Sequence, residues 1–425
     1  MSSPDVLQQE TQRLKRAVEE LSILNDLARA IGASLNSEDI MQTIIRKSLR
    51  AVSAEQGVIT LVEKKSDEPM KTLVRAMVSS AEQSQFHFHQ ALMGWMHLNV
   101  KPLLVEDPQR DERFRGVRWD ESIQCLLCVP LLVKSELKGV LTVYNKKNGQ
   151  KFTTDDQRLL AIIAAQSAQV IENARLHEEE KAFMKMQEEV RLAAKIQIDL
   201  LPQKPPDIEG YQIIGKTLSA QEVGGDYYDF IHMEGQRMAI CLGDVTGKGL
   251  PASLLMANLQ ATLRGQTLVA TSPGECLNRS NKLLFQSTSP EKFATLFYGI
   301  LDFKNHTLFY SNAGHDHPIL VSTDRTTARL GTGGIMLGAF EDFSFEEASV
   351  RLKPGDLLVL YSDGISEAMN SKRDQYGDQP LLELVKRHQE YPVGQILEAI
   401  MEDVRKHVDN YPQSDDMTLV IVKRN

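Results

Sequence analysis

The sequence predicts a multidomain protein that combines α/β and α+β architecture. Its 425 residues are enough for two or three domains. Runs typical of strands alternate with helical runs in both halves of the chain. Between the halves, Thr154 to Leu201 contains neither glycine nor proline, which predicts a long helical connection that Pro202 ends. We therefore expect a small α/β domain, a helical linker and a larger α+β domain.

The composition excludes two classes of partner. The hydrophobic fraction of 42% is enough for ordinary soluble cores, and the net charge of −9 argues against a nucleic-acid-binding surface. No apolar run approaches the ~20 residues needed to span a bilayer, and the N-terminus has no signal-peptide pattern. We expect a cytoplasmic protein that binds neither nucleic acid nor membrane.

The first half begins with a helical pattern. Residues 5–31 carry apolar positions at heptad spacing, which predicts a helix that either forms a dimer seam or docks on its own domain. Asn36 to Asp39 then predicts a helix start before the run Ile40–Val52. Strands and one short helix are expected at Gly57–Val62, Thr72–Val78, Ala91–Trp95 (the helix), Leu103–Glu106, Cys125–Val133 and Gly139–Tyr144.

Cys125 and Cys128 could be half of a redox or zinc site, or simply core thiols. We favour core thiols, because an odd spacing on a strand points the two side chains to opposite faces. No second pair of cysteines or histidines completes a zinc site.

The helical run from Thr154 carries two apolar seams that are displaced by two positions, with charged Glu178–Lys181 between them. Such a register break in a coiled coil can transmit rotation or unwinding. The alternative is two separate helices. The first seam comprises Leu160, Ile163, Ser167, Val170, Ala174 and His177, and the second comprises Phe183, Met186, Val190, Ala193, Gln197 and Leu200.

The second half alternates strands and helices, with a hairpin around Lys304-Asn305. This pattern is compatible with two sheets packed face to face and helices outside. Strands are expected at Tyr211–Leu218, Asp229–His232, Met238–Gly243, Thr295–Phe303, His306–Ser311, Ile319–Ser322, Ala348–Leu352, Leu357–Ser362 and Thr418–Lys423. Helices are expected at Pro251–Leu268, Pro273–Ser287, Pro380–Gln389 and Gln395–Val408.

Four aspartates, Asp226, Asp244, Asp363 and Asp415, lie where strands meet loops. Asp244 follows a buried strand in the loop Gly-Asp-Val-Thr-Gly-Lys-Gly-Leu, and a carboxylate there is costly unless a cation such as Lys248 pairs with it. Four clustered carboxylates cannot all stay ionised without cations. Because oxygen ligands favour hard cations, we predict a site for Mg²⁺ or Mn²⁺.

Four motifs carry a resemblance to a known family, and they follow one another in the family's order. They are Glu222–Asp229, Gly243–Ser253, Leu360–Ala368 and Ser414–Val420. They resemble the PPM-type (protein phosphatase 2C-like) serine/threonine phosphatases, in the bacterial SpoIIE/RsbU-like branch. The resemblance implies an α-β-β-α sandwich and two divalent cations, Mn or Mg, that activate a water between them.

The resemblance also implies roles for individual residues. Asp244 would bridge both ions, the Val245 carbonyl and Asp226 would serve one of them, and Asp363 and Asp415 would hold the other. Asp416 is expected to support the ligands from outside, while Gly225 and Gly364 let backbone approach the ions closely.

Several nearby residues keep two interpretations. Asp229 is either an acid of the site or an exposed strand residue, and Glu367 is either such an acid or a helix-start charge. His315 and His317 form either a metal or acid/base pair or a structural turn, and we favour the turn. No arginine precedes Asp226 where eukaryotic relatives bind phosphate, so phosphate affinity is expected to depend on the metals.

The first half resembles a GAF sensor domain over about residues 20–175, with an unknown ligand. The matching pieces are Gly94-Trp95, Asp107–Phe114, Val129–Leu131 and Gly139–Leu141. Asn145-Lys146, Phe152 and Asp156 partly match the pattern of cyclic-nucleotide-binding GAF domains, with Gln157 in place of the final Glu; we favour a structural interpretation.

We thus expect an N-terminal helix (1–19), a GAF domain (20–175), a coiled-coil linker (176–205) and a phosphatase domain (206–425). The expected function is a homodimeric, GAF-regulated protein phosphatase acting on a phosphorylated anti-sigma-factor antagonist. The alternatives are a non-catalytic GAF-dimer scaffold that binds a partner, and a cyclic-nucleotide enzyme, which lacks a nucleotide-phosphate loop. The regulatory contacts are expected at Glu188, Val190, Ala193, Gln197 and Leu200.

Overall fold

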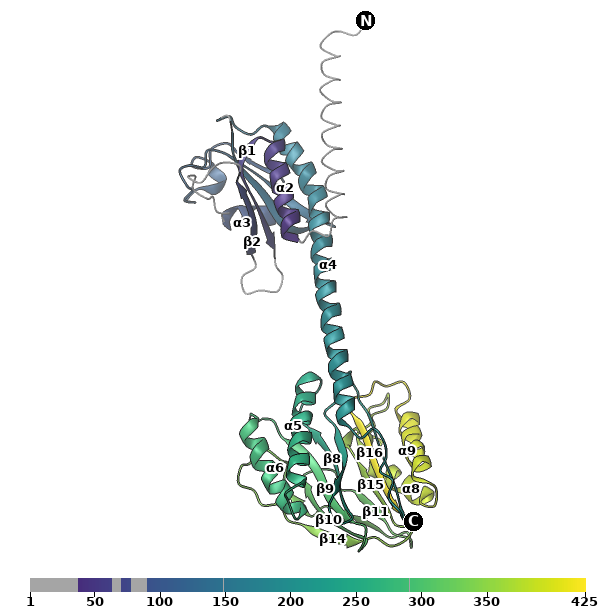
Figure 1. Ribbon diagram of the computed structural model, residues 1–425. Coiled ribbons are helices and arrows are strands. Elements are labelled where there is room, and N and C mark those ends of the chain that lie inside the picture. Colours follow the sequence, from purple (N-terminus) through teal and green to yellow (C-terminus); the bar gives the residue numbers. More distant parts are fainter. Residues whose placement is uncertain (1–36, 63–69, 78–89, 148, 290) are drawn as a thin grey trace. The chain divides into compact units, whose positions relative to one another are not determined.

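The computed structural model describes residues 37–62, 70–77, 90–147, 149–289 and 291–425. The predicted N-terminal helix, including its heptad positions within 5–31, lies outside these residues. The chain divides into two compact units between Lys185 and Met186, inside the long helix labelled α4 in Figure 1. Among the described residues no helix has the length and apolar character to cross a bilayer. The domain limits expected from the sequence stay predictions.

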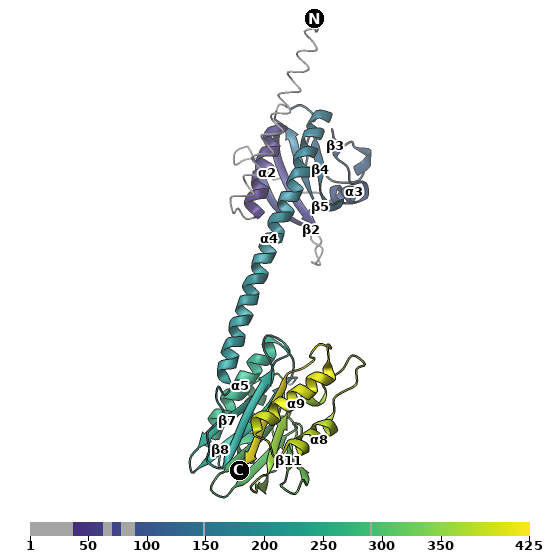
Figure 2. The same cartoon turned by 90° about the vertical axis from the view of Figure 1, so that its right-hand side faces the viewer.

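The first unit is an antiparallel sheet of order β2-β1-β5-β4-β3 with helices on both faces, as Figure 2 shows. Apolar residues of α2 and of the first half of α4 form a core with one face, and α3 covers the other. Every element predicted between Ile40 and Tyr144 is present. The bounds are α2 Ser37–Ala51, β1 Ala54–Val62, β2 Met70–Met77, α3 Gln90–Asn99, β3 Leu103–Val105, η1 Glu112–Phe114, β4 Leu126–Val133 and β5 Glu136–Lys146.

Two motifs of this unit are structural. Cys125 belongs to the core beneath α2 and α4, whereas Cys128 belongs to the core on the opposite face, as the odd spacing predicts. The Asn145 side chain accepts hydrogen bonds from backbone N–H groups at the start of β4. Lys146 forms an ion pair of 2.6 Å with Asp156. These polar side chains therefore have partners within the domain, which agrees with the structural interpretation of the motif.

The linker α4 is one continuous helix, Thr154–Leu200, so the alternative of two separate helices is wrong. The first seam packs in the first unit: Leu160, Ile163, Ser167 and Val170 are buried. The second seam is divided. Phe183 and Met186 are 62% and 65% exposed. Its last four positions, Val190, Ala193, Gln197 and Leu200, are half-buried or buried.

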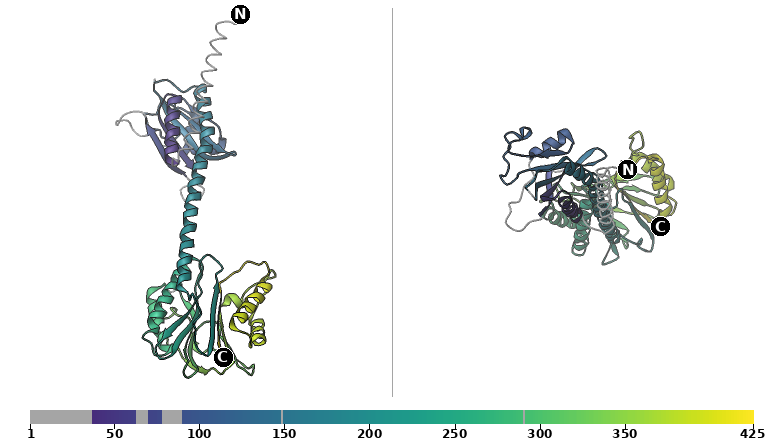
Figure 3. Two further views of the ribbon diagram at one scale, coloured as in Figure 1. Left: turned by 45° about the vertical axis from the view of Figure 1, so that its right-hand side comes forward. Right: turned by 90° about the horizontal axis from the view of Figure 1, so that it is seen from above.

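The second unit is an α-β-β-α sandwich, as predicted (Figure 3). One core lies between the sheets β13-β10-β9-β8-β7 and β12-β11-β15-β16-β6, and two others lie under α5 and α6 and under α8 and α9. The helix bounds are α5 Leu250–Thr267, α6 Pro273–Ser287, α7 Asp363–Ser366, α8 Asp378–His388 and α9 Val393–Val408. The strand bounds are β6 Tyr211–Leu218, β7 Tyr227–Met233, β8 Arg237–Val245, β9 Ala294–Asp302, β10 Thr307–Ala313, β11 Ile319–Val321, β12 Thr327–Arg329, β13 Gly333–Gly334, β14 Ala348–Arg351, β15 Leu357–Tyr361 and β16 Met417–Arg424.

The strand register brings the four predicted aspartates to one edge of this sandwich. In the first sheet the start of β7 pairs with the end of β8, with Tyr227 opposite Gly243. In the second sheet the end of β15 pairs with the start of β16, with Tyr361 opposite Leu419. Because antiparallel neighbours place the end of one strand beside the start of the next, loops that are far apart in sequence meet there.

Candidate active site

Asp244 lies at the end of β8 with its side chain half-buried. Burial, together with the negative charges of Asp363, Asp415 and Asp416, raises the pKa of its carboxyl to about 7. Such coupling requires carboxylates to lie close together in a poorly hydrated environment. The structure therefore brings Asp244 together with acids from two other strand ends.

Asp226 immediately precedes β7 and is 5% exposed. Its Oδ2 accepts a hydrogen bond from the Thr418 hydroxyl of β16, which joins the two sheets at this edge. Burial raises the pKa of Asp226 well above its usual value, and the charges of Asp244 and Asp416 add to the effect. A buried carboxyl without a nearby cation is held protonated by these same forces.

Asp363 and Asp415 complete the predicted set. Asp363 is the first residue of α7, and burial followed by the charges of Asp415 and Glu367 raises its pKa. The sequence suggests Lys248 as a partner for Asp244, but the Lys248 ammonium lies 2.8 Å from Asp415 Oδ2 instead. The Lys248 ammonium also donates to the Ser414 carbonyl at 2.6 Å. Both partners of Lys248 thus lie in the loop just before β16, and neither is Asp244.

Two glycines leave the room that the site needs. A Cβ on Gly225 would lie 3.0 Å from Asp244 Oδ1 and 3.2 Å from the Val245 carbonyl oxygen. These two oxygens therefore face the same small space beside the Gly225 backbone. A Cβ on Gly364 would lie 2.0 Å from the Asp416 carbonyl oxygen, so any side chain there would separate α7 from the start of β16.

Asp416 holds the loop that carries Asp226. Its carboxylate accepts hydrogen bonds from the backbone N–H groups of Ala220 (2.8 Å), Gly225 (2.6 Å) and Asp226 (3.3 Å). Asp416 thus holds the backbone of the loop that carries Asp226, and its charge also contributes to the raised pKa of Asp226 and Asp244.

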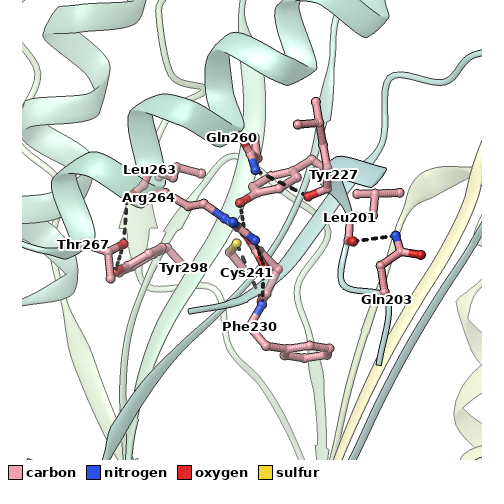
Figure 4. Close-up of polar contacts among 12 residues, drawn as sticks. Leu201, Gln203, Tyr227, Phe230, Cys241, Gln260, Leu263, Arg264, Thr267 and Tyr298 are labelled. Atoms are coloured by element: carbon pink, nitrogen blue, oxygen red, sulfur yellow. Dashed lines mark hydrogen bonds and ion pairs between the residues drawn. The ribbon is translucent and has the colours of Figure 1, made fainter. Parts of the chain in front are cut away.

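Asp229 is neither exposed nor in the acidic group. It is 1% exposed, and its carboxylate pairs with Arg264 of α5 at 2.7 Å and accepts a hydrogen bond of 2.7 Å from the Tyr227 hydroxyl. Figure 4 shows Arg264 and Tyr227 converging between α5 and the sheet. The expectation of an exposed residue was wrong. A signal was present, because Arg264 is the single charged residue of α5.

The two histidines agree with the interpretation as a structural turn, whereas Glu367 does not begin a helix. The backbone of His315 exchanges hydrogen bonds with the Asn312 side chain around Gly314, whose φ is +68°. Burial lowers the pKa of His315 to about 4, and its Nδ1 lies 3.0 Å from the Thr295 hydroxyl. His317 is exposed. Glu367 is exposed as well, but it follows the last residue of α7, so the expectation of a helix-start charge was wrong, and its charge contributes to the raised pKa of Asp363.

The donors at this edge fit a hard divalent cation in their chemistry. They are carboxylates and one backbone carbonyl, and cations would relieve the mutual repulsion that, after burial, raises the pKa of Asp244 and Asp363. Across the described ranges, however, no group of three or more His, Cys, Asp or Glu side chains is arranged so that it could hold a metal ion. The ion pair of Asp415 with Lys248 and the hydrogen bond of Asp226 with Thr418 turn two of the carboxylates toward other partners.

Comparisons with known proteins agree with this architecture. The fold, the acidic edge and the family match together identify the second unit as a PP2C-type phosphatase domain. A family model described as "Stage II sporulation protein E (SpoIIE)" matches residues 234–425, and a GAF domain model matches residues 34–172. The chain thus carries a GAF domain followed by a phosphatase domain of the SpoIIE family.

Individual relatives are more distant. Phosphoserine phosphatase RsbU of Bacillus subtilis is 28% identical over 56% of this chain and 70% of its own length. Protein IcfG of Synechocystis is also 28% identical over 56% of this chain, but the alignment spans only 42% of IcfG. The solved SiaA-PP2C domain of Pseudomonas aeruginosa matches with a TM-score of 0.50 and 20% identity, over 57% of this chain and 99% of that domain, which shows a shared fold.

Proposed function

We propose that this chain is a metal-dependent phosphoserine/phosphothreonine protein phosphatase. The observation that carries the proposal is the convergence of buried, mutually repelling aspartates at one edge of the sandwich. Two divalent cations, Mn or Mg, would share Asp244. The Val245 carbonyl and Asp226 would hold one of them, and Asp363 and Asp415 the other. Such ions, when bound, lower the pKa of a water and neutralise phosphate oxygens.

The substrate class follows from the relatives. RsbU and RsbP of Bacillus subtilis both carry the name phosphoserine phosphatase. By analogy, we propose that this chain acts on a phosphorylated protein, an anti-sigma-factor antagonist of a partner-switching pathway, and that the GAF domain senses the signal.

Phosphate release by the full chain tests the proposal. Mn²⁺-dependent hydrolysis of p-nitrophenyl phosphate and of a phosphoserine protein should fall more than about a hundredfold in Asp244→Asn and Asp363→Asn. Asp342→Asn is the matched control, because Asp342 is 87% exposed on the same domain. If wild-type protein releases no phosphate with Mn²⁺ or Mg²⁺, the chain is a non-catalytic scaffold and the proposal fails.

We extend the proposal to regulation through α4. The buried side chain of Gln197 donates to the Gly224 carbonyl at 2.6 Å and accepts from the Gly224 N–H at 3.0 Å. Gln260 of α5 donates to the Leu200 carbonyl at 3.4 Å, and Figure 4 shows Gln260 over the end of the linker. Because Gly224 lies two residues before Asp226, a shift of the last turns of α4 would move a proposed metal ligand.

Replacing Gln197 tests this link. Gln197→Ala removes two hydrogen bonds, and we expect Mn²⁺ affinity and kcat to fall about tenfold with the fold retained. Gln187→Ala is the control, since Gln187 is exposed on the same helix. Wild-type activity in Gln197→Ala would remove Gln197 from the regulatory set, which also includes Glu188, Val190, Ala193 and Leu200.

We also propose that the exposed part of the second seam joins two copies of the chain. Phe183 and Met186 are mostly exposed at helical spacing on α4. A chain carrying Phe183→Glu and Met186→Glu should sediment as a monomer at concentrations where wild-type protein is a dimer. Equal sedimentation of the two proteins would place the dimer contact elsewhere or show that there is none.

A further inference from the structure

A phosphorylated substrate brings negative charge to an edge that is already acidic, so a cationic side chain without a partner there would add to the phosphate affinity that the metal ions supply. Most cations of this unit near the site have fixed partners. Lys248 is paired with Asp415, and Arg264 is paired with Asp229. Arg329 is paired with Asp378 at 2.9 Å. Burial and the charge of Asp363 raise the pKa of Asp316, and the charge of Arg329 lowers it.

Lys292 differs from these cations. It is half-buried just before β9, and across the described part of the chain its ammonium has neither a hydrogen-bond nor an ion-pair partner. An ammonium without a partner in the protein is available to pair with an anion. This is the state expected of a group whose partner arrives with a ligand.

The position of Lys292 is set by the ladder that also places Asp244. Val245 pairs with Ala294 in the β8–β9 register, and the Thr246 N–H donates to the Phe293 carbonyl at 3.0 Å. The ladder therefore brings Lys292 beside Gly247, three residues after Asp244.

The ammonium of Lys292 uses space that Gly247 leaves open. A Cβ on Gly247 would lie 3.4 Å from Lys292 Nζ. Gly247 has φ +100°, a conformation that disfavours any side chain there. The Lys292 backbone is fixed as well, because its N–H donates to the Ser289 carbonyl at 2.8 Å. The lysine is thus held against the loop that carries Asp244, with its charge free.

We propose that Lys292 is a substrate-positioning residue whose ammonium binds a phosphate oxygen of the phosphoserine or phosphothreonine. The inference rests on the proposed phosphatase function and supplies the cation for which the sequence shows no arginine before Asp226. Lys292 donates to an oxygen that does not leave, and it takes no part in proton transfer. Its contribution is to affinity for the phosphate dianion.

The test uses the full chain with Mn²⁺ at fixed ionic strength and inorganic phosphate as the probe. Lys292→Met should raise the Kd of phosphate, measured by calorimetry, about tenfold, and should raise KM for p-nitrophenyl phosphate similarly. The kcat should change no more than about twofold, and Lys292→Arg should restore most of the affinity because the charge returns. The control is Lys282→Met, because Lys282 pairs with exposed Asp342 on the same domain.

A second readout is independent of turnover. Acetylation of Lys292 by a water-soluble acylating reagent, followed by mass spectrometry, should slow when phosphate is added, while acetylation of Lys282 should not. The inference is overturned if Lys292→Met binds phosphate as tightly as wild type, or if it lowers kcat with KM unchanged. If wild-type protein itself releases no phosphate from any phosphoester, the proposed function fails, which is a different result.

Discussion

Replacing Asp244 by Asn should stabilise the metal-free protein at pH 8. Burial and three neighbouring carboxylates raise the Asp244 pKa from 3.8 to about 7. A raised pKa means that the folded state favours the protonated acid. The associated stability is complete below about pH 4 and is lost as pH rises to about 7. Roughly three pKa units correspond to about 4 kcal/mol at pH 8, and asparagine removes this cost because it keeps the shape without the charge.

Calorimetry of the full chain in EDTA measures the effect on the transition of the phosphatase unit. At about 2–4 °C per kcal/mol for a unit of this size, Asp244→Asn should melt roughly 8–16 °C higher than wild type at pH 8 and equally at pH 4. Mn²⁺ should raise the melting temperature of wild type only. Asp342→Asn controls for the loss of a surface charge. If Asp244→Asn melts no higher than wild type at pH 8, the acids do not repel one another as described.

Three further substitutions follow from the same contacts. Arg264→Met leaves Asp229 buried and unpaired and should cost about 3–5 kcal/mol in urea unfolding; a loss under 1 kcal/mol would contradict the pairing. Lys248→Met removes the ammonium that occupies Asp415, so Mn²⁺ should bind several-fold tighter by calorimetry, and weaker binding would refute the competition. Gly225→Ala places a Cβ 3.0 Å from Asp244 Oδ1 and should abolish Mn²⁺ binding while circular dichroism stays unchanged.

The sequence predicted the architecture well because its signals are local. Strand and helix patterns placed β6 and α6 at their observed bounds, and the glycine- and proline-free run predicted α4. It missed α7, the single turn that begins at Asp363, because four residues are too few to show a helical period. It also predicted the meeting of the four aspartates, since each lies at a strand end and antiparallel order brings such ends together.

The partners of charged groups could not be predicted, because they depend on contacts across long sequence distances. Lys248 lies four residues from Asp244 yet pairs with Asp415 across the junction of the two sheets. Asp229 reaches Arg264 in the next helix. Gln197 meets Gly224 because the last turns of α4 pack against the phosphatase unit that follows them. Propensity and period carry no information about such pairs.

The division of the second seam links these observations to regulation. A single seam through all six positions would require the same face of α4 to contact a second helix along its whole length. The structure uses its C-terminal part within the phosphatase unit, where Gln197 holds Gly224, and leaves Phe183 and Met186 exposed. A dimer that formed only at the exposed part would leave this contact intact. A dimer in which the two α4 helices pair as far as Leu200 would have to displace the contact between Gln197 and Gly224. Gly224, which directly precedes Gly225 and Asp226, would then lose its hydrogen bonds to the helix. The extent of pairing along α4 would thereby control the order of the acidic edge.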